Sequence, residues 1–139
     1  MTIAIFGSPY PQHFSKYIQH LIKKLETEHI KIIVEETFYL FLKNNVRLKK
    51  EAETFNSYEK LKDNANYLLS IGGDGTLLKA ATYVRSSNIP ILGINTGRLG
   101  FISSISAAQI DDAINDLLKG NFKINERTLL ELNTDKNLF

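Results

Sequence analysis

The sequence has no cysteine, no tryptophan and only one methionine among its 139 residues. Without cysteine the chain can form neither a disulfide framework nor a zinc site built from thiolates. No apolar run approaches membrane-spanning length, and the first residues lack the basic and then apolar pattern of a secretory leader. We therefore expect an intracellular, cytoplasmic protein that has no membrane partner.

The chain also lacks an excess of charge of either sign. Its 17 lysines and arginines nearly balance its 15 aspartates and glutamates, and the formal net charge is +2. So small a charge does not favour binding to nucleic acid, and we expect no nucleic-acid partner. Hydrophobic residues make up 43% of the chain and charged residues 23%, which is typical of one soluble globular domain with a buried core.

Two groups of ionisable side chains are interpreted as solvated. Basic residues gather in the segment 43–50, but Glu51 and Glu53 follow at once, which favours an exposed helix end over a nucleic-acid site. His13 and His20 lie seven residues apart and lack a third ligand, so we expect no metal site there. The metal-binding residues of the protein stay unknown at this point.

Segments typical of strands and of helices alternate along the chain. The expected strands are short apolar or β-branched runs, and the expected helices carry apolar residues at helical spacing. Strands are expected at 2–6, 30–34, 67–71 and 90–95, and helices at 14–25, 35–45, 77–86 and 106–119, the last opening with a Ser106–Gln109 capping box and ending at Gly120. This alternation predicts an α/β fold with a Rossmann-like, doubly wound parallel sheet covered by helices.

Three segments fit this pattern less well. Residues 46–66 are polar with only fragments of helical spacing, and we expect a mobile connection there. The apolar run Phe38–Leu42 is expected to supply core residues and a domain or subunit contact, and we expect the full-length protein to be a homo-oligomer. After a change of pattern, Thr128–Leu132 is typical of a strand.

A glycine-rich turn, Gly72-Gly73-Asp74-Gly75-Thr76, precedes the helix expected at 77–86. Glycines leave the backbone bare, so N–H groups at a helix N-terminus can meet a phosphate. An aspartate there repels a phosphate unless it accepts a proton, holds a metal ion or bonds a ribose hydroxyl, and this combination points to phosphoryl transfer onto a hydroxyl. The alternative is that Asp74 caps the helix by accepting the N–H of Thr76 or Leu77. The turn is neither a G-x-G-x-x-G fingerprint nor a P-loop.

A second glycine-rich stretch, LGINTGRLGF at 92–101, continues from the strand expected at 90–95. Loops at the carboxyl ends of neighbouring parallel strands face the same crevice, so we expect both glycine-rich segments to line one cleft. Phe101 in such a loop is placed to stack on a planar ring. The alternative is that its ring lies in the core, as most phenylalanine rings do.

Three motifs in this order resemble the N-terminal domain of the NAD kinase family: GGDGT at 72–76, PILGINTGRLGF at 90–101 and NERTLLEL at 125–132. The resemblance covers essentially the whole chain. Similar glycine turns occur in lipid kinases of the diacylglycerol and sphingosine type and in phosphofructokinases, but the LGIN-x-G-x-LGF continuation separates NAD kinases from those lipid kinases. The resemblance implies two parts in the chain, an α/β domain at 1–125 that carries the GGDGT turn and the first residues of a second, β-rich domain at 126–139.

The resemblance implies an enzyme that transfers the terminal phosphate of ATP, or of polyphosphate in some members, to the 2′-hydroxyl of the adenosine ribose of NAD. The product is NADP, and Mg²⁺ accompanies ATP as the divalent cation. Asp74 matches the family's proton acceptor. Lys79 matches a usually basic position that contacts nucleotide. It lies on the same helix face as Gly75, so its side chain can reach back to the turn. The alternative is that Lys79 is an ordinary solvated lysine. The nucleotide-binding positions implied in this way are Gly73, Asp74, Gly75, Leu78, Lys79 and Phe101.

The second domain of that family supplies an Asn-Glu or Asn-Asp pair and much of the NAD site, and nothing in these 139 residues matches it. We therefore expect the chain, as a fragment or an incomplete gene product, to be inactive alone. Two other functions stay open. One is a lipid kinase of the diacylglycerol or sphingosine type, and the other is a nucleotide-binding module without catalysis.

Overall fold

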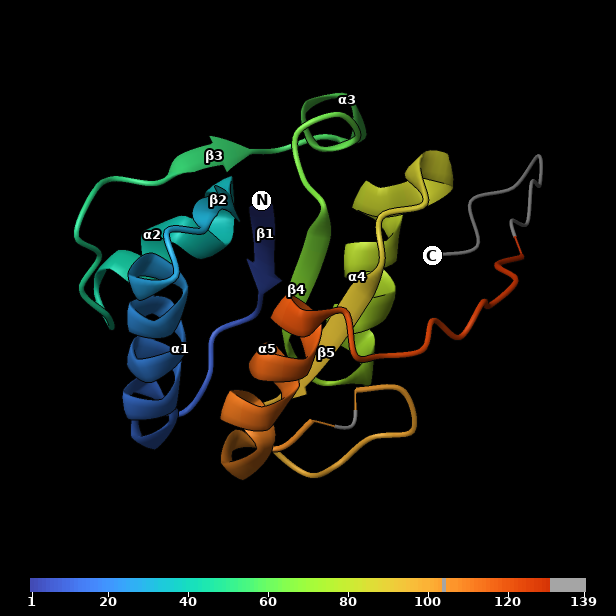
Figure 1. The fold of residues 1–139 in the computed structure, drawn as a ribbon. Coiled ribbons are helices and arrows are strands. Elements are labelled where there is room, and N and C mark those ends of the chain that lie inside the picture. The colour runs from blue at the N-terminus through green and yellow to red at the C-terminus, as the bar shows by residue number, and fades with distance from the viewer. Residues whose placement is uncertain (104, 131–139) are drawn as a thin grey trace, which may run out of the picture.

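The computed structural model describes residues 1–103 and 105–130 and contains a five-stranded parallel sheet with helices on both faces (Figure 1). The strands are β1 (Thr2–Gly7), β2 (Lys31–Glu35), β3 (Glu53–Phe55), β4 (Tyr67–Gly72) and β5 (Ile91–Asn95). They lie in the order β3-β2-β1-β4-β5, and every neighbouring pair runs parallel. The chain therefore winds outward from β1 in both directions, which confirms the predicted doubly wound α/β sheet.

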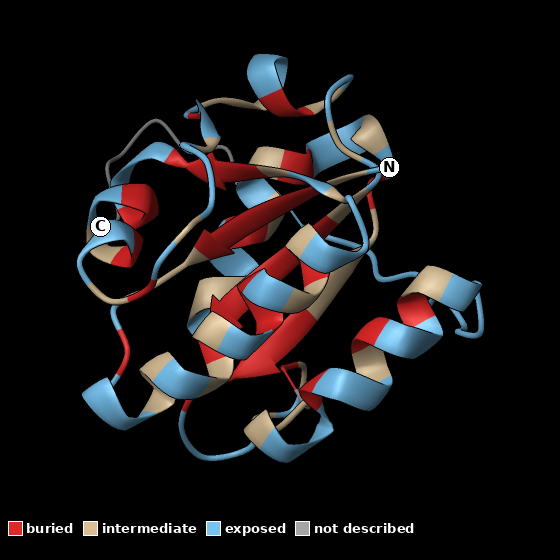
Figure 2. Cartoon of the chain, turned by 60° about the vertical axis from the view of Figure 1, so that its left-hand side comes forward, coloured by how far each residue is buried: buried red, intermediate tan, exposed pale blue. Residues whose placement is uncertain are grey.

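The helices cover two separate apolar layers. α1 (Ser15–Thr27), α2 (Glu36–Lys43) and α5 (Ile110–Lys119) pack on one face, and α3 (Tyr58–Leu61) and α4 (Asp74–Val84) pack on the other. Alternate strand residues point to opposite faces, so Ile3 and Ile5 enter the first layer while Ala4 and Phe6 enter the second. Figure 2 shows the buried strands between helices whose outer sides are exposed. Short 3₁₀ turns lie at Gln12–Phe14, Arg85–Ser87 and Ala107–Gln109.

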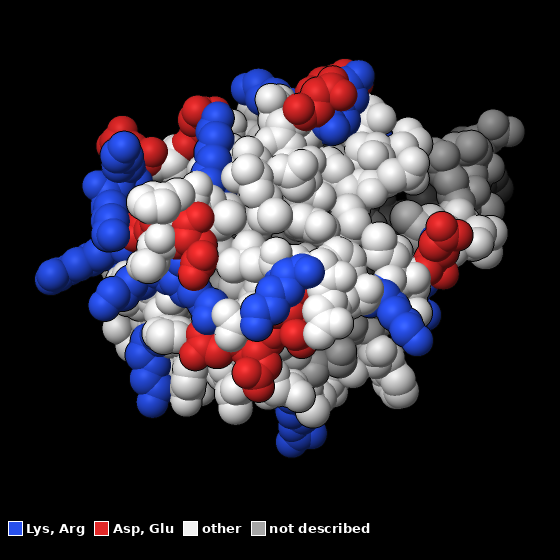
Figure 3. Space-filling view, in the orientation of Figure 1, with Lys and Arg blue, Asp and Glu red and all other residues white. Residues whose placement is uncertain are grey.

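Charged side chains are spread over the surface rather than gathered by sign. On the face shown in Figure 3, basic and acidic side chains lie close to one another, and the area above and to the right of the centre carries few charges. Within the described ranges, no helix combines the length and the apolar character needed to cross a membrane.

The segment 46–66 is not the mobile connection that its composition predicts, because it contains β3 and α3. Strand β3 extends the sheet by pairing with β2, with Phe55 opposite Glu35. The side chains of Phe55 and Leu61 are buried, and the Phe55 ring meets the Tyr83 ring of α4 edge-on with 5.7 Å between centroids. The prediction was therefore wrong, and this segment completes the layer under α4.

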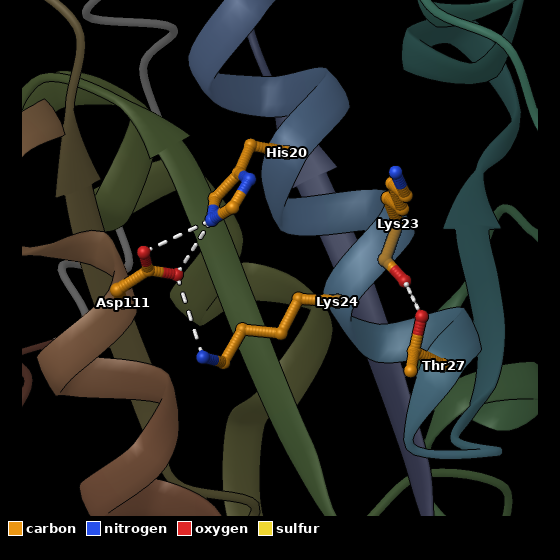
Figure 4. Close-up of polar contacts among 5 residues, drawn as sticks. All are labelled: His20, Lys23, Lys24, Thr27 and Asp111. Atoms are coloured by element: carbon orange, nitrogen blue, oxygen red, sulfur yellow. Dashed lines mark hydrogen bonds and ion pairs between the residues drawn. The ribbon is translucent and has the colours of Figure 1, made fainter.

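Helices α1 and α5 are joined by a small cluster of ionisable groups (Figure 4). The His20 Nε2 lies 2.8 Å from Asp111 Oδ1, and the Lys24 Nζ lies 3.4 Å from the same oxygen. The hydrogen bond from His20, with a smaller contribution from Lys24, holds the pKa of Asp111 below its usual range. The His20 side chain is 58% exposed, so the prediction of a solvated histidine is right about exposure but misses the partner. Because the pair is so exposed, it stabilises the fold only slightly.

The apolar run in α2 contributes mainly to the core, as predicted. Phe38, Tyr39 and Leu42 are buried, and Phe41 packs against the same cluster. Leu40 differs because its side chain is 59% exposed. The expected subunit contact of this run stays a prediction.

The remaining boundaries follow the sequence closely, with two exceptions. Helix α4 begins at Asp74, three residues before the expected start, and ends at Val84, two residues before the expected end. Residues 121–130 form neither helix nor strand, so the strand expected at 128–132 is not seen in its described part, and residues 131 and 132 lie outside the described residues. The capping box is confirmed, because the Ser106 N–H donates to the Gln109 side chain at 3.0 Å. The domain boundary after residue 125 stays a prediction.

Candidate functional site

Two glycine-rich segments meet at the carboxyl edge of the sheet. We call residues 72–76 the glycine turn and residues 96–103 the β5 loop. Strands β4 and β5 pair up to Gly72 opposite Asn95, and the Thr96 N–H donates to the Gly72 carbonyl at 3.2 Å. Beyond the loop, Ile105 returns to pair with β5 in an isolated bridge to Ile94. The two segments therefore lie side by side, as expected from the strand order, whereas the cleft that they were expected to line stays a prediction.

The glycine turn combines close packing with open space. A Cβ added at Gly72 would lie 2.7 Å from the Cβ of Thr76, so this position has no room for a side chain. At Gly73 and Gly75 an added Cβ would meet nothing within 4 Å. Helix α4 starts directly after Gly73 and has no side-chain cap. Its first turn therefore borders open space, where an anion can approach the N–H groups of the helix N-terminus.

Asp74 does not cap its own helix. Its carboxylate instead accepts three backbone N–H groups from the β5 loop: Phe101 donates to Oδ2 at 2.8 Å, and Ile102 and Ser103 donate to Oδ1 at 3.1 and 2.9 Å. These bonds, that of Ser103 most and then those of Phe101 and Ile102, hold the pKa of Asp74 below the ordinary value of an aspartate. The capping alternative is therefore wrong. We call this arrangement the Asp74 clamp; it keeps the carboxylate ionised and fixed against the loop.

Phe101 is on the surface and not in the core. Its side chain is 99% exposed, which overturns the core alternative. Leu99 on the same loop is 65% exposed, and Leu78 in α4 is 51% exposed. Large apolar side chains on both segments are thus available to a planar or apolar ligand group.

Lys79 has a different environment from the other predicted site residues. It lines an open polar pocket of about 370 Å³ between α3 and α4, together with Tyr58, Glu59 and Arg85 among others. The predicted reach of Lys79 back to the glycine turn stays a prediction.

Polar residues that the sequence argument did not single out support the site. The buried Asn95 side chain donates to the Ser103 carbonyl at 3.1 Å and accepts the Gly97 N–H at 2.8 Å, which shapes the β5 loop from beneath. The hydroxyls of Ser8 and Thr76 hydrogen-bond at 2.7 Å and join β1 to the glycine turn. Ser8 and Asn95 lie at the carboxyl ends of parallel strands, and that position alone could have identified them.

The described residues do not provide a metal site. In the part of the chain that the structure describes, no group of three or more His, Cys, Asp or Glu is arranged to hold a metal ion. Three acceptor positions of the Asp74 carboxylate already receive N–H groups. The described residues therefore give no position for a magnesium ion, and we assign it no step on this chain.

Comparison with known proteins identifies the family of the chain. The family profile described as ATP-NAD kinase N-terminal domain matches residues 3–122. The NAD kinase of Cytophaga hutchinsonii is 38% identical over 100% of this chain and 48% of its own length, and that of Christiangramia forsetii is 36% identical over 97% and 46%.

Two solved structures share the fold. The yeast NADH kinase complexed with NADH superposes with a TM-score of 0.70 at 16% identity, covering 87% of this chain and 38% of the yeast chain. The Archaeoglobus fulgidus NAD kinase in complex with ATP gives a TM-score of 0.55 at 24% identity, covering 86% of this chain and 38% of that chain. The chain spans about half the length of the curated relatives it matches. Because the family profile covers most of it, the chain belongs to the ATP-NAD kinase N-terminal domain family.

Proposed function

We propose that this chain works in an enzyme that phosphorylates NAD at the 2′-hydroxyl of its adenosine ribose, with ATP as donor and NADP as product. The observation that carries the proposal is the Asp74 clamp, which holds an ionised carboxylate between two loops with open space beside it. Relatives at 36% and 38% identity that carry the name NAD kinase support the same reaction and favour it over lipid phosphorylation.

The carboxylate geometry suggests how Asp74 takes part. A carboxylate has about four acceptor positions, and the clamp occupies both on Oδ1 and one on Oδ2. One position on Oδ2 is left, and there the ribose hydroxyl donates its hydrogen bond. A carboxylate with a lowered pKa is a good acceptor but a weak base. Asp74 therefore orients the hydroxyl first and takes its proton late, as the new P–O bond forms in a loose transition state.

The surrounding residues supply nucleotide binding. The uncapped first turn of α4, with open space at Gly73 and Gly75, suits a phosphate of the nucleotide. The exposed Phe101 ring suits a base, and Leu78 adds apolar surface nearby on α4. We propose that Mg²⁺ accompanies the phosphates of ATP. We also propose a cytoplasmic location, where ATP and NAD are both found, and a homo-oligomeric state to which the exposed Leu40 of α2 contributes.

The test is Asp74→Asn in the complete protein, with NADP formation measured from labelled ATP. We expect the rate to fall by roughly 10²–10⁴-fold, because an amide cannot take the ribose proton at neutral pH. The matched control is Asp63→Asn, the same change at an exposed residue just beyond α3, which should leave the rate unchanged. An Asp74→Asn protein that keeps more than half of the wild-type rate would contradict the proposal. Wild-type protein that binds NAD by calorimetry without making NADP would support the non-catalytic alternative.

A further inference from the structure

Gly100 lies directly against the Asp74 carboxylate. A Cβ added at Gly100 would lie 2.5 Å from Asp74 Cγ and 2.6 Å from Oδ2, and it would come closer still to Oδ1. Such distances are well inside van der Waals contact. The glycine is needed here for space and not for backbone freedom, because among the glycines of the chain only Gly72 and Gly120 have positive φ. Gly100 is therefore the point at which the loop backbone can touch the carboxylate.

Four consecutive residues, Gly100 to Ser103, surround the Asp74 carboxylate closely. The Gly100 N–H donates to the Ser103 carbonyl at 3.3 Å, and the next three N–H groups point to Asp74. The β5 loop cannot easily move away from Asp74, because hydrogen bonds hold it to β5 and to the glycine turn. Asn95 holds the Ser103 carbonyl, and Thr96 bonds the glycine turn. Asp74 is fixed as well, since it is the first residue of α4.

We propose that Gly100 is a positioning residue for the phosphoryl transfer: its missing side chain lets the β5 loop close on Asp74, which fixes the free acceptor position of Oδ2 and the Phe101 backbone, from which the ring projects, relative to each other. This inference rests on the proposed function for its link to catalysis. The geometric part stands on the contacts alone. One backbone segment thereby sets the positions of both the acceptor for the ribose hydroxyl and the platform for the base.

The test compares Gly100→Ala with Gly97→Ala in the complete protein. Both glycines lie on the β5 loop and neither has a positive φ, but an added Cβ at Gly97 has Asn95 Oδ1 as its nearest neighbour, at 3.9 Å. We expect Gly100→Ala to lower kcat by between about ten- and 100-fold and to raise the KM for NAD, because small misplacements of reacting groups have effects of this size. Gly97→Ala should stay within about twofold of wild type in both.

A second readout does not depend on activity. Carbon-13 NMR of the Asp74 carboxyl group during a pH titration reports its pKa, and amide exchange reports the protection of residues 101–103. In wild type and Gly97→Ala the pKa should be below the ordinary aspartate value, whereas in Gly100→Ala it should return toward that value with faster exchange. Unchanged titration and exchange in Gly100→Ala would overturn the inference, whatever the activity.

Two further outcomes are decisive. An opened clamp with unchanged kcat and KM would refute the positioning role. Wild-type protein that makes no NADP would overturn the proposed function, and the NMR comparison would then still decide whether Gly100 closes the loop.

If the Gly100→Ala protein melts at a lower temperature than wild type, adding Asp74→Ala should recover part of the lost Tm, because it removes the group that the new Cβ meets. Strictly additive losses would show that the two residues do not compete for space.

Discussion

Replacing Phe101 by alanine should weaken NAD binding without destabilising the fold. The ring is 99% exposed, so its removal takes almost no buried area from the core. Its backbone N–H donates to Asp74, and alanine keeps that N–H. The substitution therefore removes the ring and leaves the Asp74 clamp in place.

The expected loss follows from the area that a stacked base can cover. A phenylalanine side chain exposes roughly 200 Å², of which a base on one face covers about half. At about 25 cal/mol per Å², that burial contributes about 2.5 kcal/mol. Ordering the ring takes back about 0.5–1.5 kcal/mol. The net loss on truncation is then about 1–2 kcal/mol, or a rise of about 5- to 30-fold in the Kd for NAD.

Calorimetry with NAD and a thermal melt on the same preparation of the complete protein measure both quantities. Phe101→Trp should keep the affinity, because it keeps a stacking face. Leu99→Ala, on the same loop and 65% exposed, controls for a general loss of apolar surface and should have a smaller effect. A large fall in Tm with an unchanged Kd would refute the reasoning, because a buried ring leaves a cavity that costs about 3–5 kcal/mol.

Two further predictions concern stability. Phe55→Ala should lower the free energy of unfolding, measured by urea denaturation, by about 3–5 kcal/mol, because the ring is buried under α4. The control is Thr54→Ala on the exposed side of β3, which should change the free energy of unfolding little. Equally small effects of both substitutions would support a mobile segment at 46–66. The pKa values of Asp74 and Asp111 are lowered in the folded state, so the stability these groups provide is complete above the unfolded value of about 3.9 and is lost as the pH falls through their folded values. Urea curves should therefore show a free energy of unfolding that owes no pH dependence to these two groups between pH 7 and pH 5 and that declines below about pH 4. Asp74→Asn and Asp111→Asn should each decline less than wild type, and a variant that declined as steeply as wild type would contradict the assignment of that group.

The elements that the sequence predicted correctly are those whose apolar residues repeat over several turns or fill a whole strand. Helix α1 buries Ile18, Leu21, Ile22 and Leu25, which are the residues that define its stripe. The strand β4 is an uninterrupted run of buried residues from Leu68 to Gly72, because helices cover both faces of the sheet. In such elements the pattern of apolar residues along the sequence directly reflects which side chains are buried.

The segment 46–66 could not be predicted in this way because its elements are too short to carry a period. Strand β3 is three residues long at the edge of the sheet, and only Phe55 in it is buried. Helix α3 has four residues, of which only Leu61 is buried. The hydrogen bonds of β3 come from β2, and both elements pack with residues of α4, which are distant in sequence.

The Asp74 clamp was beyond local reasoning for a related reason. Its donors lie 27 to 29 residues further along the chain. The sequence identified Asp74 and Phe101 as separate members of a site, and strand order explains why they are close. No pattern of residue types indicates that a backbone segment, rather than a side chain, holds the carboxylate.

The bridge between Ile94 and Ile105 has a consequence for the thermodynamics of nucleotide binding. The Asn95 N–H donates to the Ile105 carbonyl at 2.7 Å, and the Ile105 N–H donates to the Gly93 carbonyl at 3.3 Å. The β5 loop thus returns to the strand from which it left, and most of the conformational entropy of closing it is lost when the protein folds. A ligand that binds at this edge of the sheet therefore has no loop backbone to close, and only side chains such as that of Phe101 are left to order.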